Sequence, residues 1–402
     1  MKLLVLTYGT EGDTRPLAAL SHALRLAGAD VHLLGDARTL SSAHELGLPA
    51  SALSGDIREL LAERTKRGPK GIAKALMQLT NANTKAWMAE TLAAAHGCDA
   101  ILTSGLAGFV GLSVGEYLGI PTIGTSMIPL TPSSEFPSPF LPAGCVPAWL
   151  NRASLRLTNQ LVWQAFKKTL NEARTTLPGL PPCRKLSTEH PMLYGISPTL
   201  LPQPADWPSH ARLCGQWAAP AGDFSPPLEL AGFLKAGPAP VYIGFGSMAG
   251  IDAPRTLDAL IAALAGRRAL FYPGWSGMDE VALPANILRI GTTPHDWLFP
   301  RTAAVIHHGG SGTSHSATRA GKPSVVVPFA GDQFFWADRL ARLGIAPPTL
   351  DGGHINARAL TEAIAFVEQP QVQEKAARLG ENMAREDGLA MAVMAIEKLI
   401  DE

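Results

Sequence analysis

The chain is poor in cysteine, has no charge imbalance and contains no long apolar run. Its four cysteines, among 402 residues, lack CxxC spacing, so we expect neither a metal cluster nor a disulfide framework. Lys and Arg number 34, as do Asp and Glu, which disfavours a nucleic-acid partner because such proteins usually carry a basic surplus. No apolar run reaches the length of about 18 residues that predicts a membrane-spanning helix. We therefore expect a cytoplasmic protein.

Short apolar strands alternate with helices along the first half of the chain. Residues 3–7 form a continuous apolar run, which is typical of a parallel strand covered on both faces. Helical spacing follows over residues 16–27, and a further helix is predicted over 108–118. A similar series of strands and helices begins at Val241. The pattern predicts an α/β fold with two Rossmann-like, doubly wound parallel-sheet domains that face each other across a cleft.

The domain boundaries follow from changes in composition. Prolines and small residues are concentrated over 202–240, which marks a linker between the two halves. We expect an N-terminal domain over 1–215, a linker over 216–238, a C-terminal domain over 239–385, and a last helix over 386–402.

A glycine-rich turn follows the predicted strand 303–306. It contains His307, His308, Gly309, Gly310, Ser311, Gly312 and Thr313. Glycines allow close approach of a ligand to the backbone, and the first N–H groups of the next helix have no partners within it, which suits a phosphate or diphosphate. The turn is neither a P-loop nor GxGxxG. A strand-to-helix turn without a ligand is the alternative.

A second polar pair, Asp332 and Gln333, follows the predicted strand 324–327. A carboxylate that accepts hydrogen bonds and an amide that donates or accepts them are suited to adjacent sugar hydroxyls. Taken alone, the pair fits equally well as the N-cap of a helix.

These motifs resemble a known family. Residues 294–340, together with 241–248, closely resemble the donor-binding signature of GT-B-fold inverting glycosyltransferases, especially the sterol glucosyltransferase and glycopeptide or macrolide branch. The resemblance implies that His307 and the 309–313 turn hold the donor diphosphate with Ser247. It further implies that Asp332 and Gln333 hold the transferred sugar. By the same resemblance, the domain over 1–215 binds the acceptor, the domain over 239–385 binds the nucleotide sugar, and the helix over 386–402 returns to the N-terminal domain. Trp275 is a candidate for packing near the nucleobase of the donor, or is an ordinary half-buried side chain.

The N-terminal turn, residues 9–16, resembles the family's catalytic loop. Asp13 matches the residue taken as the base in this branch, and Gly12 and Thr14 beside it are further candidates for donor contact. The alternative is that Asp13 only caps the helix that follows. Glu11 stands where the branch often has Arg, which leaves the charge beside the base open.

The donor implied by the resemblance is a nucleotide diphosphate sugar, with UDP-glucose favoured and a dTDP-sugar open. No DxD motif is present, so we expect a metal-independent enzyme without a cofactor. Met127, Phe136 and Phe140 are candidates for contact with a hydrophobic small-molecule or lipid acceptor, although each is also a plausible core residue. The basic run 64–74 is either a solvated face or a peripheral contact with anionic lipid.

Two other functions fit a two-domain protein that binds a nucleotide sugar. One is an epimerase-type isomerase of a UDP-sugar, which would leave Asp13 and the Asp332–Gln333 pair without a role. The other is a non-catalytic auxiliary homologue of a glycosyltransferase. The intact polar residues at both motifs disfavour it.

Overall fold

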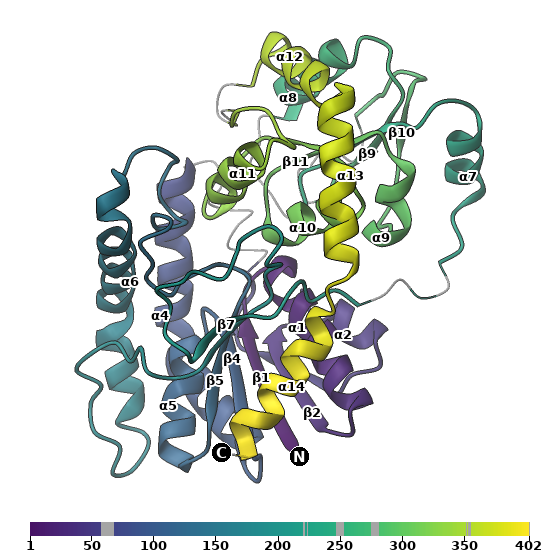
Figure 1. Ribbon diagram of the computed structural model, residues 1–402. Helices are drawn as coiled ribbons and strands as arrows, with labels where there is room; N and C mark the ends of the chain where they lie inside the picture. Colours follow the sequence, from purple (N-terminus) through teal and green to yellow (C-terminus); the bar gives the residue numbers. More distant parts are fainter. Residues whose placement is uncertain are drawn as a thin grey trace.

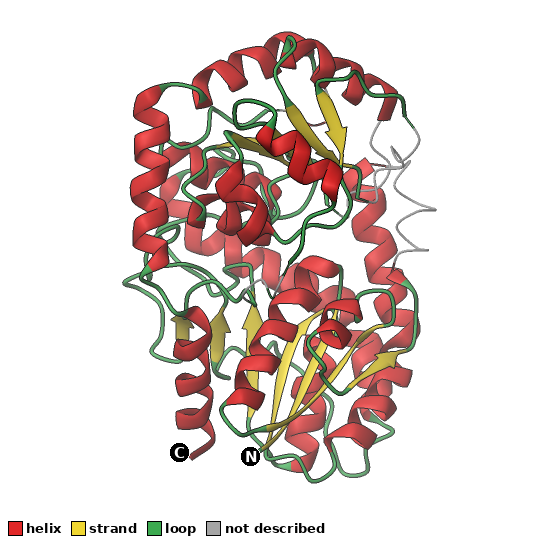
Figure 2. Ribbon diagram, turned by 90° about the vertical axis from the view of Figure 1, so that its right-hand side faces the viewer, coloured by secondary structure: helices red, strands yellow, loops and turns green. Residues whose placement is uncertain are grey.

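The computed structural model describes residues 1–57, 68–219, 222, 224–246, 253–274, 281–350, 352 and 355–401. It contains two parallel sheets, one above the other, each in its own half of the molecule (Figures 1 and 2). The expected α/β fold with two Rossmann-like domains is confirmed. Among the described residues, no helix has both the length and the hydropathy needed to cross a bilayer.

The N-terminal sheet has seven strands in the order β3-β2-β1-β4-β5-β6-β7, and every pair is parallel. Its strands are β1 Lys2–Tyr8, β2 Asp30–Asp36, β3 Ala50–Leu53, β4 Ala100–Gly105, β5 Thr122–Ser126, β6 Met192–Tyr194 and β7 Ala211–Leu213. The helices of this half are α1 Glu11–Leu26, α2 Ser41–Glu45, α4 Gly68–Ala95, α5 Gly108–Leu118, the short 3₁₀ helix η2 Ala148–Leu150, and α6 Asn151–Arg174.

The C-terminal sheet has five parallel strands in the order β10-β9-β8-β11-β12. They are β8 Val241–Gly244, β9 Ala269–Tyr272, β10 Ile287–Arg289, β11 Ala304–His307 and β12 Ser324–Val326. The helices are α7 Leu228–Lys235, α8 Ala253–Leu264, α9 His295–Leu298, the 3₁₀ helix η3 Phe299–Arg301, α10 Ser311–Arg319, α11 Gln333–Arg342, α12 Ala357–Val367 and α13 Pro370–Ala384.

Both faces of each sheet are covered, as the continuous apolar strands require. In β1, Leu3 and Val5 pack with α1, whereas Leu4 and Leu6 pack with the α4–α6 side. Successive side chains of a strand point to opposite faces, so an uninterrupted apolar run fills two cores. In the C-terminal sheet, neighbouring residues of β8 are divided between two cores in the same way.

The last helix, α14 (Gly388–Asp401), lies on the N-terminal half. Figure 1 shows α13 running down from the C-terminal half and α14 continuing to the end of the chain beside α1. Ala392 and Ile396 of α14 are fully buried and belong to the same apolar cluster as Leu17 and Leu20 of α1. The chain therefore crosses between the halves twice.

Strand order locates the site. In each sheet the winding reverses between two central strands, β1 and β4 in one and β8 and β11 in the other. Ligands of such sheets bind at the carboxyl ends of the strands on either side of this switch point. The N-terminal turn with Asp13 follows β1, and the glycine-rich turn with His307 follows β11. Both turns therefore lie at switch points.

Several sequence predictions of local structure need correction. The turn predicted over 9–13 is mostly helix, because α1 begins at Glu11 and Asp13 lies in its first turn. Likewise α10 begins at Ser311 and α11 at Gln333, earlier than the helices over 314–320 and 336–343 that the sequence pattern predicts. The strands β6 and β7, three residues each, were too short to predict. The range expected as a linker contains the helix α7.

Candidate active site

Asp13 is held at the N-terminus of α1, beside the end of β1. Its Oδ2 accepts hydrogen bonds from the Thr10 backbone N–H at 2.8 Å and from the Thr10 hydroxyl at 3.3 Å. The carboxylate folds over Gly9, where a Cβ would lie 2.2 Å from Oδ2. Burial raises the pKa of Asp13, and the Thr10 donors lower it. Within the described residues Oδ1 accepts no hydrogen bond, so Asp13 caps the helix through one oxygen only.

The residues next to Asp13 differ in how deeply they are buried. Gly12 is exposed on the first turn of α1. Thr14 is fully buried, and its hydroxyl lies 2.8 Å from that of Thr39 inside the N-terminal domain. A helix turns by about 100° per residue, so the side chain of residue 14 faces the core, and the donor contact of Thr14 stays a prediction. Glu11 forms an exposed pair with Arg15 at 3.6 Å.

The glycine-rich turn leads directly into an uncapped helix N-terminus. Gly310 is the N-cap of α10 and has no side chain to satisfy the first N–H groups. Gly312 is exposed, Thr313 is half-buried and Ser311 is almost buried. Free N–H groups and the helix dipole together attract an anion. The turn therefore has the chemistry of a phosphate site.

Gly309 joins the turn to the second motif. Its φ is +92°, a conformation that side chains with a Cβ rarely adopt. A Cβ here would lie 2.7 Å from Val326 Cγ1 and 2.9 Å from the Gln333 carbonyl oxygen. Gly309 thus sets the close approach of the two motifs, and its function is to shape the backbone.

His307 is fully buried and neutral. Its Nδ1 accepts a hydrogen bond from the Gly309 N–H at 3.1 Å, which places the ring proton on Nε2. Burial holds the pKa of His307 well below its ordinary value. In the described part of the chain this buried Nε2 has no hydrogen-bond partner. Burial also lowers the pKa of the adjacent His308, to about 4.

Asp332 precedes α11 and is held by a tryptophan one turn along the helix. The Trp336 indole N–H donates to Asp332 Oδ2 at 2.9 Å. Burial, and to a smaller extent the charge of Asp13, raise the pKa of Asp332 to about 6 against the Trp336 hydrogen bond, which lowers it. The influence of Asp13 indicates that the two carboxylates lie near each other across the domain boundary.

Gln333 has a structural role that the sequence did not predict. Its Oε1 accepts hydrogen bonds from the backbone N–H groups of Phe329 at 2.7 Å and Ala330 at 3.1 Å. The side chain is 8% exposed. The amide oxygen therefore shapes the turn before α11, and it is not available to a sugar hydroxyl.

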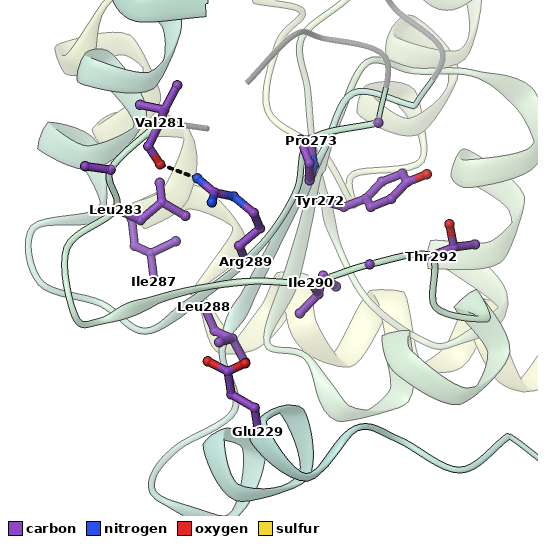
Figure 3. Close-up of a pocket in the computed structure, with 13 residues that line it drawn as sticks. Glu229, Tyr272, Pro273, Val281, Leu283, Ile287, Leu288, Arg289, Ile290 and Thr292 are labelled. Atoms are coloured by element: carbon purple, nitrogen blue, oxygen red, sulfur yellow. Dashed lines mark hydrogen bonds between the residues drawn. The ribbon is translucent and has the colours of Figure 1, made fainter. Parts of the chain in front are cut away.

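A hollow of about 910 Å³ lies at the carboxyl ends of β9 and β10 (Figure 3). Tyr272 and Pro273 line it on one side, Ile290 and Thr292 on another, and Glu229 of α7 lies beyond Leu288. Its position, at the same sheet edge as the α10 turn, suits another part of the same ligand. The candidates Ser247 and Trp275 lie outside the described residues, as do residues 64–67 of the basic run.

Two of the three acceptor candidates are core residues. Met127 is 8% exposed and packs in the N-terminal core. Phe136 is 7% exposed, and its ring meets that of Phe335 of α11 edge-on, with centroids 5.5 Å apart. These side chains are occupied by packing, so the prediction that they contact the acceptor is not supported. Phe140 is 42% exposed.

Sequence reasoning missed the residues that join the domains at the site. His315 of α10 accepts a hydrogen bond at Nε2 from the Ser197 backbone N–H of the N-terminal half, at 3.1 Å. Its Nδ1 lies 2.7 Å from the Ser311 carbonyl oxygen. The ring also packs edge-on against Trp336. Of the contacts at the site, the sequence indicated only the one between Asp332 and Trp336, through their spacing of four residues.

Two Rossmann-like domains with an uncapped helix N-terminus and a carboxylate in one and a carboxylate in the other have the arrangement of GT-B glycosyltransferases, whose solved structures this fold matches. The chain belongs to the glycosyltransferase family that includes sterol glucosyltransferases and glycopeptide and macrolide glycosyltransferases. Residues 261–399 match the family model described as erythromycin biosynthesis protein CIII-like, C-terminal domain.

The chain is 33% identical to a sterol 3-beta-glucosyltransferase of Arabidopsis thaliana, over 99% of this chain and 68% of the plant protein. It is 36% identical to vancomycin aglycone glucosyltransferase of Amycolatopsis orientalis, over 98% and 96% of the two chains. The chain spans 27% of the length of the sterol 3-beta-glucosyltransferase of Candida albicans. Among solved structures, glycosyltransferase VinC in complex with dTDP matches with a TM-score of 0.70 at 18% identity, over the full length of both chains.

Proposed function

We propose that this glycosyltransferase moves a hexose, with glucose favoured, from a nucleotide diphosphate sugar to a hydroxyl of a hydrophobic small-molecule or lipid acceptor, with inversion at the anomeric carbon. The observation that carries the proposal is the facing pair of carboxylates, Asp13 and Asp332, beside the uncapped N-terminus of α10. One carboxylate is suited to the acceptor and the other to the transferred sugar.

The α10 turn is suited to the donor diphosphate. The first N–H groups of α10 would donate to its oxygens, as would the neutral Nε2–H of His307, which has no partner among the described residues. Negative charge grows on the diphosphate as the glycosidic bond breaks, so fixed donors at this point favour the transition state over the ground state. The hollow at the ends of β9 and β10 would take the nucleoside.

Asp13 would act as the general base. Its Oδ1 takes the proton of the acceptor hydroxyl while the oxygen attacks the anomeric carbon, and the bond from that carbon to the diphosphate oxygen breaks. Attack from the face opposite the leaving group inverts the anomeric centre. The pKa of Asp13, raised by burial, makes its carboxylate a stronger base, and the hydrogen bonds from Thr10 act against this rise.

UDP-glucose is the favoured donor because related sequences are named glucosyltransferases. The dTDP in the complex of VinC makes a dTDP-sugar the alternative. Asp332 would accept hydrogen bonds from the sugar hydroxyls, with Trp336 holding its orientation.

The test is a turnover assay with each donor. The protein is incubated with UDP-glucose or dTDP-glucose, and slow hydrolysis to the free diphosphate is followed. A panel of sterols, polyketides and aromatic alcohols is then searched for a hexose mass increase, and the linkage of the product is determined by NMR. Release of an epimerised nucleotide sugar without transfer, or retention of the anomeric configuration, would refute the proposal.

A further inference from the structure

Helix α6 carries an apolar stripe on its outer face. Trp149 in η2 is 81% exposed, Leu157 is 61% exposed and Leu161 is 62% exposed. With the exposed Ala153, these residues recur every four positions, so they lie along one side of the helical segment. We name Trp149, Leu157 and Leu161 the α6 stripe.

The stripe is additional to the face that α6 buries. Leu155 and Trp163 on the other side are each 1% exposed and belong to packed clusters of the N-terminal half. A surface helix normally places polar residues opposite its buried face. An exposed row of large apolar side chains of this kind marks an interaction surface.

Positive charge is enriched on the two helices that carry and neighbour the stripe, although Arg152 pairs with Asp206 and Lys168 with Glu172. The segments 68–89 and 149–171 together contain seven Lys and Arg and no Asp or Glu, although the whole chain has a formal net charge of +0. Arg156 of α6 is exposed between stripe positions. The neighbouring helix α4, which lies along α6 in Figure 1, exposes Lys74 and Lys85. These two are eleven residues apart and therefore on one face of α4.

This combination fits a membrane surface better than a second copy of the chain. Self-association through the stripe would bring cations of two copies together, which costs free energy unless anions intervene. A bilayer with anionic lipids complements the charge and admits the apolar side chains. Tryptophan in particular is favoured at the interface between headgroups and acyl chains.

The stripe is continuous with the loop that carries the exposed acceptor candidate Phe140. The Ser138 backbone N–H donates to Ser154 Oγ at 2.9 Å, which ties this loop to the first turn of α6. Asn159 of α6 donates to the Leu130 carbonyl at the start of the loop, at 2.9 Å. The loop with Phe140 is therefore held against α6, beside the helix that carries the stripe.

We propose that the α6 stripe and the cations beside it form a docking surface for an anionic membrane. Trp149, Leu157 and Leu161 enter the interfacial region of the bilayer, while Arg156, Lys74 and Lys85 meet lipid phosphates. The docking itself is independent of the proposed transfer reaction. Only the entry of a lipid acceptor from the membrane side rests on the proposed transfer reaction.

Vesicle flotation without donor or acceptor tests the docking surface. The full chain is mixed with phosphatidylcholine vesicles containing roughly 30% phosphatidylglycerol, and in parallel with pure phosphatidylcholine. We expect binding to the anionic vesicles that weakens in roughly 0.5 M NaCl. The triple variant W149S/L157S/L161S should bind at least about tenfold more weakly, because its apolar anchors are gone. The variant K74E/K85E should lose the preference for anionic lipid.

The matched control is Leu228→Ser, which removes a 92% exposed leucine from α7 on the other half of the molecule. It should bind vesicles as the wild type does. All variants should keep the wild-type melting temperature and rate of donor hydrolysis, which separates failure of docking from failure of the transfer proposal. Wild type that stays unbound, or a triple variant that binds equally well, overturns the docking surface. A dimer that dissociates in the triple variant without vesicle binding assigns the stripe to self-association instead.

Discussion

Asp13 of the N-terminal domain and Asp332 of the C-terminal domain repel each other across the domain boundary. The charge of Asp13 adds to the burial that raises the pKa of Asp332, to about 6. Two carboxylates in one site can have different pKa values and different roles when their surroundings differ. Asp13 is held by donors of the Thr10 cap, whereas Asp332 is held by the Trp336 indole. The repulsion would be relieved by a substrate placed between them.

Asp13→Asn should abolish transfer and leave donor binding intact. The amide keeps an oxygen for the Thr10 backbone N–H, so the helix cap survives, but it cannot take a proton from the acceptor. We expect the transfer rate to fall by about 10²–10⁴-fold. Transfer is measured by product mass, and donor affinity by calorimetry. Asp13→Ala is the companion variant, which should also lose about 1 kcal/mol of stability with the cap. Normal turnover by Asp13→Asn would exclude Asp13 as the base.

Donor affinity should depend on pH through Asp332. A carboxylate accepts hydrogen bonds from sugar hydroxyls at both oxygens, and its protonated form does so less well, so affinity should fall as the pH drops through about 6. Asp13→Asn removes a repelling charge, lowers the pKa of Asp332 and should move this fall to lower pH. Trp336→Phe removes a donor to the carboxylate, raises its pKa and should move the fall to higher pH. Titration of donor binding over pH 5–8 checks both directions.

A common midpoint for wild type and both variants would contradict the coupling of Asp332 with Asp13 and Trp336. Asp332→Asn is the control for this experiment. It removes the titrating group, so its donor affinity should be weaker and independent of pH over the same range.

Substitutions at Gly309 and Gly312 of the α10 turn should separate an effect on stability from an effect on donor binding. Gly309→Ala forces a methyl group against Val326 and the Gln333 carbonyl at a positive φ, so the free energy of unfolding should fall by about 1–3 kcal/mol. At Gly312 a Cβ would meet no atom within 4 Å. Gly312→Ala should therefore keep the stability and weaken donor binding, because the methyl group lies where the diphosphate is expected. Denaturant unfolding and calorimetry measure the two effects, and equal losses of stability would be the contrary result.

The sequence predicted the fold well because its strands are continuous apolar runs. Residues such as Leu3–Leu6 serve two cores at once, and this pattern is legible without a structure. The strand-to-helix turns after β1 and β11 could also be predicted, because each follows such an apolar strand. Helix starts were predicted late, because Asp13 and Ser311 are polar residues in first turns, where apolar periodicity has not yet begun.

Side-chain roles within the site were less accessible to sequence reasoning. Thr14 and Phe136 were predicted to contact ligands, yet helix rotation and packing across the domains direct them into cores. The amide oxygen of Gln333 accepts hydrogen bonds from the backbone of the turn before α11. Bonds such as that between Ser197 and His315 join positions more than a hundred residues apart, and nothing in the local pattern announces them.

His315 should make the stability of the domain contact depend on pH. Burial lowers its pKa from the ordinary value of 6.5 to about 4, and the neutral ring accepts the Ser197 N–H at Nε2. The folded state resists protonation in this window while the unfolded state does not. The contribution of His315 is therefore complete above pH 6.5 and is lost as the pH falls toward about 4.

His315→Phe keeps a ring against Trp336 and removes both hydrogen bonds. At pH 7.5 the variant should be less stable than wild type by about 1–3 kcal/mol, because the buried Ser197 N–H loses its acceptor. This difference should shrink as the pH is lowered, since only the wild type carries the titrating ring. Other titrating groups, such as His307 and His308, are present in both proteins and cancel. Denaturant unfolding at a series of pH values measures the difference, and a constant gap would show that His315 contributes through packing alone.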